Sequence, residues 1–389
     1  MKIALVSHLY PNRAYPASGT FIREHYLGLH GRVDTVMLVP TVRAVPLTQR
    51  WRYTHTPFNT PDEAKRLRYL SFPNRRLPRL IKRNISAALL SYLKKNRADL
   101  VHVNWLFPDG LAVPALKKEG FPVVLTIHGS DWYKTRGRPA LEKLLHRSLK
   151  QTDLILTVGA KLRNDLITAH PDLENKIRVT HNSVDFDKFT PPESRNDALA
   201  ELSWHPDKKH LLCVANFSRE KGVDVLEEAY RQLNRRDTML HMIGNIPDEP
   251  YARDISARLA RLDSVICHPP VSHDRIVAFY RACDLFVLPS RTEGFGISLA
   301  EAIACGKPVV STKSGGPEEI VNEKNGFLVE PENPEQLASK MEEVLDGSFA
   351  YSSDEIRNSI RDKFCSDRRL SEWITIYKQI VTRPAEISE

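Results

Sequence analysis

The stretch from Asp284 to Val310, DLFVLPSRTEGFGISLAEAIACGKPVV, decides the fold of this chain. An apolar run from Leu285 to Leu288 ends in a polar loop, and a helical pattern of apolar residues follows from Ile297 to Cys305. Gly306 ends that pattern before a second apolar run, from Pro308 to Val310. This order predicts one strand–loop–helix–strand unit of a parallel sheet.

The polar loop of this unit has the composition of an anion site. Loops at the carboxyl ends of strands bind ligands in open α/β sheets. Glycines let the backbone approach a ligand closely, and the free amides of residues 295–298 can receive an anion. One glutamate precedes these amides and a second follows, spaced as Glu-x7-Glu. The residues predicted to contact the ligand are therefore Glu293, Gly294, Phe295, Gly296, Ile297 and Glu301.

The same unit resembles the signature of the retaining glycosyltransferases of family 4, which have the GT-B fold. Its PSRTEGFG loop is followed by EAIACGKPVV and by SGGPEEIV, as in that family. The resemblance implies that Glu293 contacts hydroxyls of the donor sugar and that Glu301 holds the nucleotide ribose. An isolated Glu-x7-Glu would more simply be two solvated charges on a helix, but these flanking motifs argue against that alternative.

Length and composition agree with a two-domain globular protein. A chain of 389 residues is too long for one comfortable hydrophobic core. Its 41% hydrophobic and 27% charged residues are ordinary for a globular protein and exclude a disordered or fibrous one. No apolar run approaches the roughly 20 residues that span a bilayer, and the run from Ile3 to Val6 is too short for a signal peptide. We therefore expect a cytoplasmic location. Four of the five cysteines sit in or beside apolar runs, so we expect reduced, buried thiols.

Short apolar runs alternate with loops and helical patterns through both halves of the chain. This repetition predicts an α/β protein with two doubly wound parallel sheets, that is, two Rossmann-like domains. The resemblance implies the GT-B arrangement, in which such domains face each other across a cleft. We expect a first, acceptor-side domain at residues 1–190, a linker at 191–208 and a nucleotide-sugar-binding domain at 209–367. A helix at 368–381 is expected to cross back to the first domain.

A second part of the predicted donor site lies at residues 213–226, CVANFSREKGVDVL. This segment resembles the family's strand-end loop, in which a basic residue directly before glycine contacts the donor pyrophosphate. Here that residue is Lys221, for which a surface lysine in a turn is the alternative. The family usually has arginine where this chain has Asn216, so Arg219 is the candidate substitute. The resemblance also places backbone near Val271 against the nucleotide base.

The first domain contributes two predicted site residues. His128, in the segment TIHGSD, follows a buried strand and matches a family histidine beside the donor sugar. The family's first loop carries Gly-Gly near the donor phosphate; this chain keeps Gly19 and has Ser18 in place of the other glycine. We name His128, Lys221 and Glu293 as the catalytic candidates. His8 and His102 also end strands, and we expect structural roles for both.

We expect neither a metal ion nor a bound cofactor. Asp185-Phe186-Asp187 looks like the DxD metal motif of another glycosyltransferase fold, but its surroundings, HNSVDFDKF, resemble the family's Asn-Gly-Val-Asp segment. Histidines, cysteines and carboxylates do not gather at ligand spacing elsewhere in the sequence. Serine-hydrolase, P-loop and dinucleotide motifs are also absent from it.

Basic residues crowd residues 43–97, where only Asp62 and Glu63 oppose them. Aromatic and apolar residues alternate with these charges, so the region can attract an anionic membrane face or a lipid-linked acceptor carrying phosphate. The alternative is a solvated face that keeps the protein soluble. Nucleic acid is not expected, because no helix-turn-helix, RNP or zinc pattern accompanies the charge. We expect irregular structure over residues 41–80.

Together these features indicate retaining, metal-independent transfer of a sugar from a UDP- or GDP-sugar. The resemblance implies a glycan or lipid-linked acceptor of cell-envelope or exopolysaccharide synthesis, and a peripheral place on the inner face of the membrane. It also implies that the acceptor hydroxyl passes its proton to the departing phosphate. A GT-B epimerase, a phosphorylase and a non-catalytic sugar-nucleotide binder are the alternatives. The first two need acid/base carboxylates or a cofactor lysine for which the sequence offers no convincing candidate.

Overall fold

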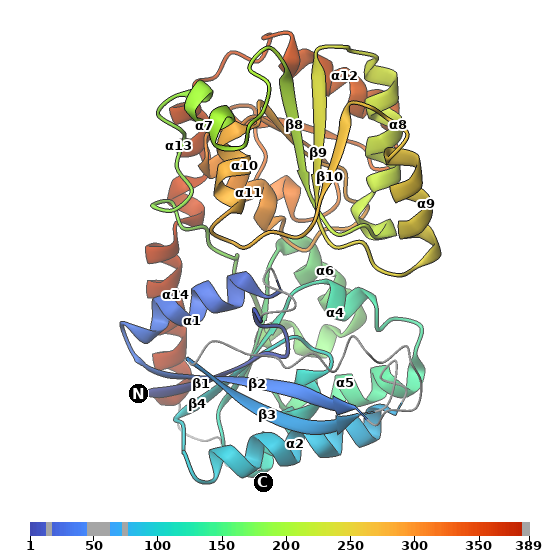
Figure 1. Cartoon of the computed structure of the whole chain (residues 1–389). Helices are drawn as coiled ribbons and strands as arrows, with labels where there is room; N and C mark the ends of the chain where they lie inside the picture. Colours follow the sequence, from blue (N-terminus) through green and yellow to red (C-terminus); the bar gives the residue numbers. More distant parts are fainter. Residues whose placement is uncertain (13–17, 45–62, 72–76, 383–389) are drawn as a thin grey trace. The chain divides into compact units, whose positions relative to one another are not determined.

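The computed structural model describes residues 1–12, 18–44, 63–71 and 77–382. These residues form two compact units (Figure 1). Unit 1 comprises Met1–His181 together with the segment that starts at Asp367, and unit 2 comprises Asn182–Ser366. Within the described ranges no helix has both the length and the apolar character needed to cross a membrane.

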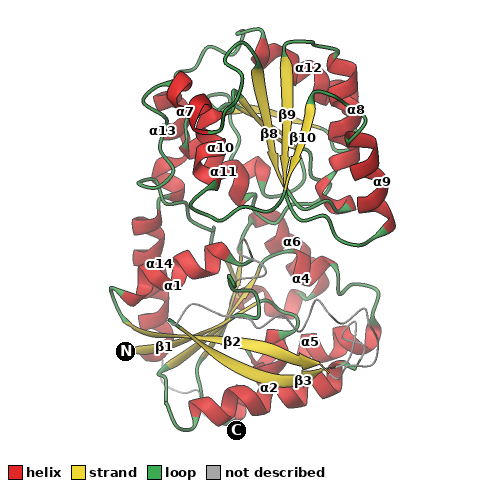
Figure 2. Ribbon diagram, viewed as in Figure 1, coloured by secondary structure: helices red, strands yellow, loops and turns green. Residues whose placement is uncertain are grey.

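Unit 1 is built on a seven-stranded parallel sheet with the order β3-β2-β1-β4-β5-β6-β7 (Figure 2). The chain fills one edge first, from β1 through β2 to β3, and then returns to place β4 on the other side of β1. The strands are β1 (Lys2–Val6), β2 (Asp34–Ala44), β3 (Ala64–Ser71), β4 (Leu100–Asn104), β5 (Val123–Ile127), β6 (Leu154–Thr157) and β7 (Ile177–Val179).

Helices lie on both faces of this sheet (Figures 1 and 2). One face is covered by α1 and by α14, whose Trp373 and Tyr377 join the same buried cluster as the strand residues Ile3 and Leu5. On the other face α2 packs along β2 and β3 and meets α3. The helices are α1 (Thr20–His30), α2 (Pro78–Leu93), η3 (Asp109–Ala112), α3 (Val113–Lys118), α4 (Ser130–Tyr133), α5 (Pro139–Gln151), α6 (Ala160–Ala169), η4 (Pro171–Lys176) and α14 (Ser366–Thr382).

Unit 2 repeats this plan with a six-stranded parallel sheet in the order β10-β9-β8-β11-β12-β13. The chain again fills one edge first, from β8 to β10, and then returns to place β11 beside β8. The strands are β8 (Lys209–Val214), β9 (Thr238–Ile243), β10 (Val265–His268), β11 (Leu285–Leu288), β12 (Val309–Thr312) and β13 (Gly326–Val329).

The helices of unit 2 also form two layers. One layer contains α8, α9 and α12, and the other contains α7, α10, α11 and α13 (Figure 1). Their bounds are α7 (Arg195–Glu201), η5 (Arg219–Lys221), α8 (Val223–Leu233), α9 (Pro250–Leu259), α10 (Ile276–Ala282), α11 (Ile297–Ala304), η6 (Pro317–Glu319), α12 (Pro334–Leu345) and α13 (Ser353–Phe364).

The unit boundary lies before the segment predicted as a linker. Unit 1 ends at His181 rather than at residue 190, and residues 191–208 belong to unit 2. Arg195 explains this attachment, because its guanidinium donates to both carboxylate oxygens of Asp284, at 2.8 and 2.9 Å, and to the carbonyl of Lys208 at 2.8 Å. A polar, proline-containing composition therefore belongs here to an ordered surface segment.

The expectation of irregular structure over residues 41–80 is wrong for the described part of that range. Strand β2 continues to Ala44, β3 covers Ala64–Ser71, and α2 begins at Pro78. Because β3 is an edge strand, its sequence AKRLRYLS carries charges that hide the usual apolar pattern of a strand. Residues 45–62 and 72–76 of this region, including Arg50, Arg52, Arg75 and Arg76, lie outside the described residues.

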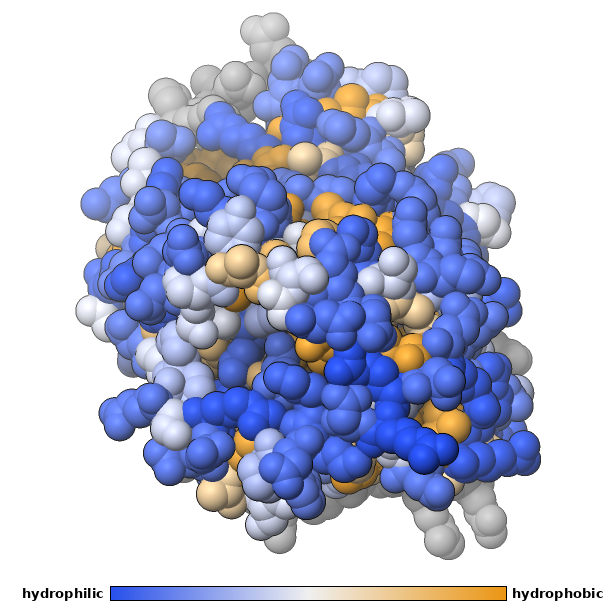
Figure 3. All heavy atoms as spheres, turned by 90° about the horizontal axis from the view of Figure 1, so that it is seen from above, coloured by the Kyte–Doolittle hydropathy of each residue, from blue (hydrophilic) through white to orange (hydrophobic). Residues whose placement is uncertain are grey.

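Large apolar side chains that reach solvent are scattered over the described surface. On the face drawn in Figure 3, hydrophilic side chains predominate and the hydrophobic areas are small and separate. Single exposed apolar residues are normal for a globular protein. The exposed ones are Met1, Leu27, Leu70, Leu77, Ile246, Ile266 and Tyr351.

Candidate functional site

Each sheet has a topological switch point, which lies between the two strands where the chain stops adding strands toward one edge of the sheet and starts adding them toward the other. In unit 2 this point lies between β8 and β11. Ligands of open α/β sheets bind in the crevice beyond the carboxyl ends of the strands at such a point. Lys221 lies in the loop that follows β8, and Glu293 lies in the loop that follows β11. The two sequence motifs therefore meet at the position where the topology predicts a ligand.

Lys221 and Glu293 form an ion pair at this switch point. Lys221 Nζ lies 2.5 Å from Glu293 Oε2, and Ser290 Oγ donates to the same oxygen at 3.3 Å. The lysine side chain is 28% exposed and the glutamate 13%, so both reach solvent from a largely enclosed position. The geometry offers a cation to an anionic ligand beside a carboxylate that can accept hydrogen bonds from hydroxyl groups.

Gly222 and Arg291 fix the loop that carries Lys221. Gly222 has φ +62°, and a Cβ at this position would lie 2.0 Å from the carbonyl oxygen of Pro289. The Arg291 amide donates to the Glu220 carbonyl at 2.7 Å, and its guanidinium binds both oxygens of Asp224 at 2.7 and 2.9 Å. Burial by itself would raise the pKa of Asp224, but these bonds lower it to about 2.

The start of α11 provides the amides that the sequence predicted. Gly296 has φ +99°, a left-handed conformation that favours glycine, and α11 follows at once with Ile297. The first amides of a helix lack partners within it, and they attract anions. The Phe295 side chain is buried against Phe364 with ring centroids 5.2 Å apart, so only its backbone can face a ligand. Gly294 is not among the glycines with positive φ.

Glu301 lies on the second turn of α11 and is 7% exposed. Its Oε1 lies 3.0 Å from His273 Nε2, and the Tyr280 hydroxyl donates to its Oε2 at 2.8 Å. Burial and the Glu301 charge together hold the pKa of Tyr280 well above its usual range. A carboxylate has about four acceptor positions, so these two bonds leave room for further hydroxyl donors such as those of a ribose.

The other residues predicted for the donor lie in the loops that follow β8 and β10. Asn216 is exposed, and its Oδ1 accepts a hydrogen bond from the Asn245 amide at 3.2 Å. Arg219 is also exposed, and its carbonyl accepts from Arg291 at 2.8 Å. Val271 is half-buried in the loop after β10. Nothing in these positions assigns a ligand contact, so their roles stay predictions.

In unit 1 the switch point lies between β1 and β4, and Gly19 packs against the loop after β1. Gly19 has φ +68° directly before α1, and a Cβ there would lie 2.5 Å from the Leu9 carbonyl oxygen. A side chain is therefore excluded for both conformational and steric reasons. The start of α1 depends on this glycine.

His128 follows β5 and presents a neutral imidazole. Its Nε2 lies 3.1 Å from Asn104 Oδ1, while Asn104 Nδ2 donates to the Val6 carbonyl. Asn104 Oδ1 is therefore the acceptor, so His128 Nε2 carries the hydrogen and Nδ1 carries the lone pair. Burial lowers the pKa of His128 to about 3. Its Nδ1 is buried and has no hydrogen-bond partner among the described residues.

His102, for which we expected a structural role, lies in the core of unit 1. Its Nδ1 is 2.8 Å from the Tyr377 hydroxyl, and its Nε2 is 2.8 Å from Thr126 Oγ1. The side chain is fully buried and stacks on Trp373 at 4.9 Å between ring centroids. This histidine joins α14 to the sheet.

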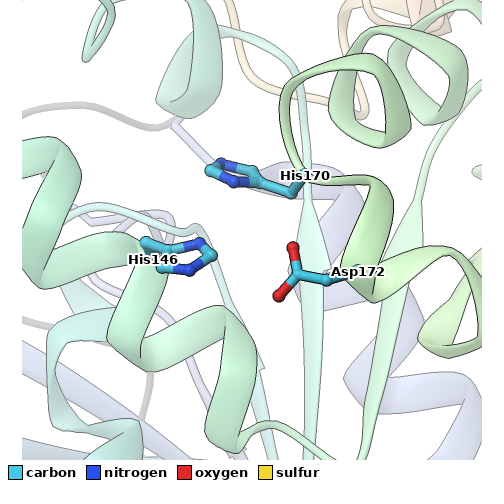
Figure 4. Close-up of side chains that lie close together, drawn as sticks. All are labelled: His146, His170 and Asp172. Carbon is cyan, nitrogen blue, oxygen red and sulfur yellow. The ribbon is translucent and has the colours of Figure 1, made fainter.

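Three further side chains of unit 1 gather at metal-ligand range, although their spacing in the sequence gives no sign of it (Figure 4). His146, His170 and Asp172 each offer one ligand atom, and these atoms lie within 4.8 Å of one another. The two imidazoles stack with centroids 4.7 Å apart and planes 28° apart, and Asp172 is paired with Lys150 at 3.4 Å. Because an imidazole binds a metal ion in its own plane, one ring would have to turn before both could share an ion.

Two family models match the chain, one on each side of the unit boundary. The model described as Glycosyltransferase Family 4 matches residues 19–188, and the one described as Glycosyl transferases group 1 matches residues 194–363. The chain is a glycosyltransferase.

Curated relatives agree with this identification of the enzyme class. The chain is 31% identical over 252 residues to an uncharacterised glycosyltransferase of Methanocaldococcus jannaschii, across 64% of this chain and 65% of the relative. It therefore spans slightly less than two thirds of that relative's length. It is 24% identical to the N-acetyl-alpha-D-glucosaminyl L-malate synthase of Bacillus anthracis, across 76% of this chain and 79% of the relative.

Solved structures confirm that this glycosyltransferase has the predicted GT-B fold. Sucrose-phosphate synthase from Thermosynechococcus elongatus superposes with a TM-score of 0.78 at 21% identity, covering 98% of this chain and 99% of the other. HepE of Anabaena, solved in complex with UDP-glucose, gives a TM-score of 0.76 at 18% identity, covering 97% of this chain and 100% of the other.

Sequence reasoning missed the residues that hold the candidate site residues in place. His273 and Tyr280 bind Glu301, Arg291 joins the two loops, and Asn104 orients His128. Arg291 lies inside the PSRTEGFG motif, so its position was a signal that could have been used. The other three lie in ordinary strand, loop or helix sequence, and their role depends on contacts that only the fold creates.

Proposed function

We propose that this glycosyltransferase transfers a sugar from a nucleoside-diphosphate sugar to a glycan or lipid-linked acceptor, with retention of configuration and without a metal ion. The donor binds unit 2. Lys221 and the first amides of α11 bind the pyrophosphate, Glu293 binds the sugar, and Glu301 binds the ribose. The observation that carries the proposal is the Lys221–Glu293 pair at the switch point of the second sheet.

The leaving group explains why a lysine and helix amides are suitable here. The pyrophosphate gains negative charge as the bond to the sugar breaks, and prepositioned cations and amides stabilise such charge. The Lys221 ammonium and the start of α11 supply both kinds of group. We propose that they do so without a divalent ion, and activity that survives EDTA would support this.

We propose UDP as the nucleotide of the donor, and this is the version of the proposal to test first. The structurally similar HepE of Anabaena was solved with UDP-glucose, and the partly exposed Glu293 suits a sugar hydroxyl. GDP-sugars remain the alternative donors. We further propose that the acceptor hydroxyl passes its proton to the departing phosphate, so the chain needs no nucleophilic side chain.

The acceptor proposal rests on the basic surface of unit 1. Lys65 and Arg68 on β3 and Arg79 and Arg83 on α2 are exposed, and Leu70 at the end of β3 is 51% exposed. Leu77, just before α2, is 50% exposed. Exposed cationic side chains and exposed leucines on the same part of the chain suit an anionic membrane face, where a lipid-linked glycan of the cell envelope would be found.

Thermal-shift measurements with UDP-, GDP- and ADP-sugars, each with and without EDTA, test the donor part of the proposal. We expect stabilisation by one nucleotide class, unchanged by EDTA. Failure of every nucleotide sugar to shift the melting temperature would contradict donor binding, and a shift that EDTA removes would contradict metal independence.

Two further experiments test the finer parts. NMR of the product made from an α-linked donor should show an α-linked sugar, and a β-linked product would refute retention. Flotation with vesicles of phosphatidylglycerol and phosphatidylcholine should carry more protein than flotation with phosphatidylcholine alone. Equal flotation would refute membrane docking while leaving the transferase proposal intact.

A further inference from the structure

Unit 1 holds a pair of residues at its own switch point that the proposed donor chemistry does not use. His8 lies two residues after the end of β1, and Asp109 begins η3 a few residues after β4. The topological switch point of the first sheet lies between these two strands, β1 and β4. The equivalent position in unit 2 carries the Lys221–Glu293 pair, so topology alone makes this a candidate ligand position.

The carboxylate of Asp109 fixes His8 in one orientation and one tautomer. Asp109 Oδ2 lies 2.8 Å from the His8 backbone nitrogen and 2.8 Å from His8 Nδ1. A carboxylate only accepts hydrogen bonds, so His8 Nδ1 carries a hydrogen, and in the neutral imidazole the lone pair is on Nε2. The Asp109 side chain is fully buried, and its Oδ1 has no partner among the described residues.

His8 Nε2 is the end of this pair that a ligand can reach. The His8 side chain is 11% exposed, whereas that of Asp109 is 0% exposed. Among the described residues, the His8 side chain forms its hydrogen bond through Nδ1. Nε2 has no partner there and is not one of the buried atoms that lack a partner. The imidazole therefore presents one hydrogen-bond acceptor at the carboxyl end of β1.

Trp105 provides an aromatic surface beside His8. Its ring packs against His8 at 5.8 Å and against His128 at 4.4 Å between centroids. The indole nitrogen donates to Ser7 Oγ at 3.1 Å. Trp105 has φ +76°, and such strain in a residue other than glycine concentrates at functional sites. His8 and His128 thus contact the same indole, and of their free ring nitrogens His128 Nδ1 is buried, which leaves His8 Nε2 for a ligand.

We propose that His8 Nε2 binds a hydroxyl group of the acceptor sugar and that Asp109 is its positioning residue. An imidazole acceptor beside an aromatic ring suits a hydroxyl of an uncharged sugar, and the buried Asp109 carboxylate disfavours a phosphate at the same place. The hydroxyl donates a hydrogen bond to Nε2, and no covalent step takes place on His8. This assignment rests on the proposed transferase function, and it replaces the structural role expected for His8 from the sequence.

Two substitutions of His8 separate binding from structure. His8→Asn places an amide NH2 near the position of Nδ1, which preserves the bond to Asp109 but removes the group at Nε2. His8→Gln reaches the position of Nε2 with an acceptor oxygen. A merely structural histidine would be replaced better by asparagine, and one that binds a hydroxyl would be replaced better by glutamine.

Two readouts concern the acceptor: enzymatic transfer to a panel of octyl glycosides, and binding of the same glycosides measured by saturation-transfer NMR. Two concern the donor: hydrolysis of the nucleotide sugar without acceptor, and the thermal shift of the protein that the nucleotide sugar causes. We expect His8→Asn to raise KM for the best octyl glycoside at least tenfold, with donor hydrolysis and donor shift within twofold of the wild type. His8→Gln should restore most of the affinity. His30→Asn, on the exposed end of α1, is the matched control.

Three results would overturn the assignment. The first is transfer by His8→Asn at the wild-type level. The second is an equal loss of acceptor transfer and donor hydrolysis in His8→Asn. The third is that NMR detects no glycoside binding to the wild type. In each case, the thermal shift caused by the donor is an independent test of the proposed function. A donor shift that persists keeps the proposed function, whereas its absence in the wild type refutes that function first.

Discussion

Lys221 Nζ and Glu293 Oε2 lie 2.5 Å apart although 72 positions separate the residues in the chain. The sheet order brings them together, because β8 and β11 are neighbours while β9 and β10 lie on the other side of β8. Lys221 is therefore held ready by a carboxylate before any ligand arrives. Under the proposed function, an incoming diphosphate would share Lys221 with Glu293 or displace Glu293, which would free that carboxylate for hydroxyl groups.

Lys221→Ala should lower turnover more than it weakens donor binding. Loss of one preorganised group that stabilises transition-state charge costs on the order of 10²–10³ in kcat. The ground-state diphosphate keeps the amides at the start of α11, so we expect the donor thermal shift to fall by less than half. Lys313→Ala removes an exposed lysine paired with Glu330 in the same unit and serves as the control. Equal losses in kcat and in donor shift would contradict this role.

Glu301→Ala should abolish the thermal shift given by the nucleotide. It should also lower the free energy of unfolding by about 1–3 kcal/mol, because the buried Tyr280 hydroxyl and His273 lose their acceptor. Glu301→Gln keeps an acceptor for Tyr280 and is the matched variant. Urea unfolding and thermal shift, measured on both variants, separate the two effects. A normal nucleotide shift in Glu301→Ala would show that the ribose binds elsewhere.

Gly222→Ala should destabilise unit 2 and lower activity together. The new Cβ would lie 2.0 Å from the Pro289 carbonyl oxygen at a residue with φ +62°, so the loop carrying Lys221 must move. We expect a loss above about 1 kcal/mol, because glycine-to-alanine changes in unsuitable conformations destabilise by more than the roughly 0.4–1 kcal/mol that suitable ones gain. Gly31→Ala, where a Cβ meets nothing within 4 Å, is the control and should change stability little. Comparable behaviour of both variants in urea unfolding would refute this account.

Acid should destabilise the protein between pH 6.5 and 3 partly through His241. This side chain is 1% exposed, stacks on Trp204, and forms hydrogen bonds with His210 and His268. Burial, together with the charges of those two histidines, lowers its pKa to about 3. The unfolded chain takes up the proton near pH 6.5, so the contribution to stability is complete above that pH. It is lost at about 1.4 kcal/mol per pH unit as the pH falls toward 3.

Urea unfolding at pH 7 and at pH 5 measures this loss. His241→Gln should reduce the difference in unfolding free energy between the two pH values, because it removes one group that gains a proton on unfolding. His205→Gln changes a histidine whose side chain is 63% exposed and should leave the difference unchanged. An unchanged difference in His241→Gln would show that other groups carry the acid response.

The sequence was most informative where local pattern and motif agree. The run from Leu285 to Val310 predicted β11, α11 and β12, and the structure confirms all three within a few residues. Gly296 and Gly222 have the left-handed conformations that favour glycine before a helix. The motifs also named Lys221 and Glu293, although the sequence assigned them separate tasks and gave no sign of their ion pair.

Contacts that depend on tertiary structure were beyond the sequence. The edge strand β3 was missed because its charged face has no apolar alternation, and His8 looked like any strand-terminal histidine. Its partner Asp109 is 101 positions away, so no spacing rule joins them. The same holds for Glu301 with His273 and Tyr280, which meet only after β10, α10 and α11 have packed.

Helix α14 lies in the same unit as the opening strand β1, while the whole of unit 2 intervenes between them in the chain. Leu370, Trp373, Tyr377 and Ile380 complete a cluster whose other members come from the first 156 residues. During synthesis on the ribosome, unit 2 can emerge and fold from one uninterrupted segment. The earlier part of the chain must wait, with an apolar surface uncovered, until its last helix leaves the exit tunnel.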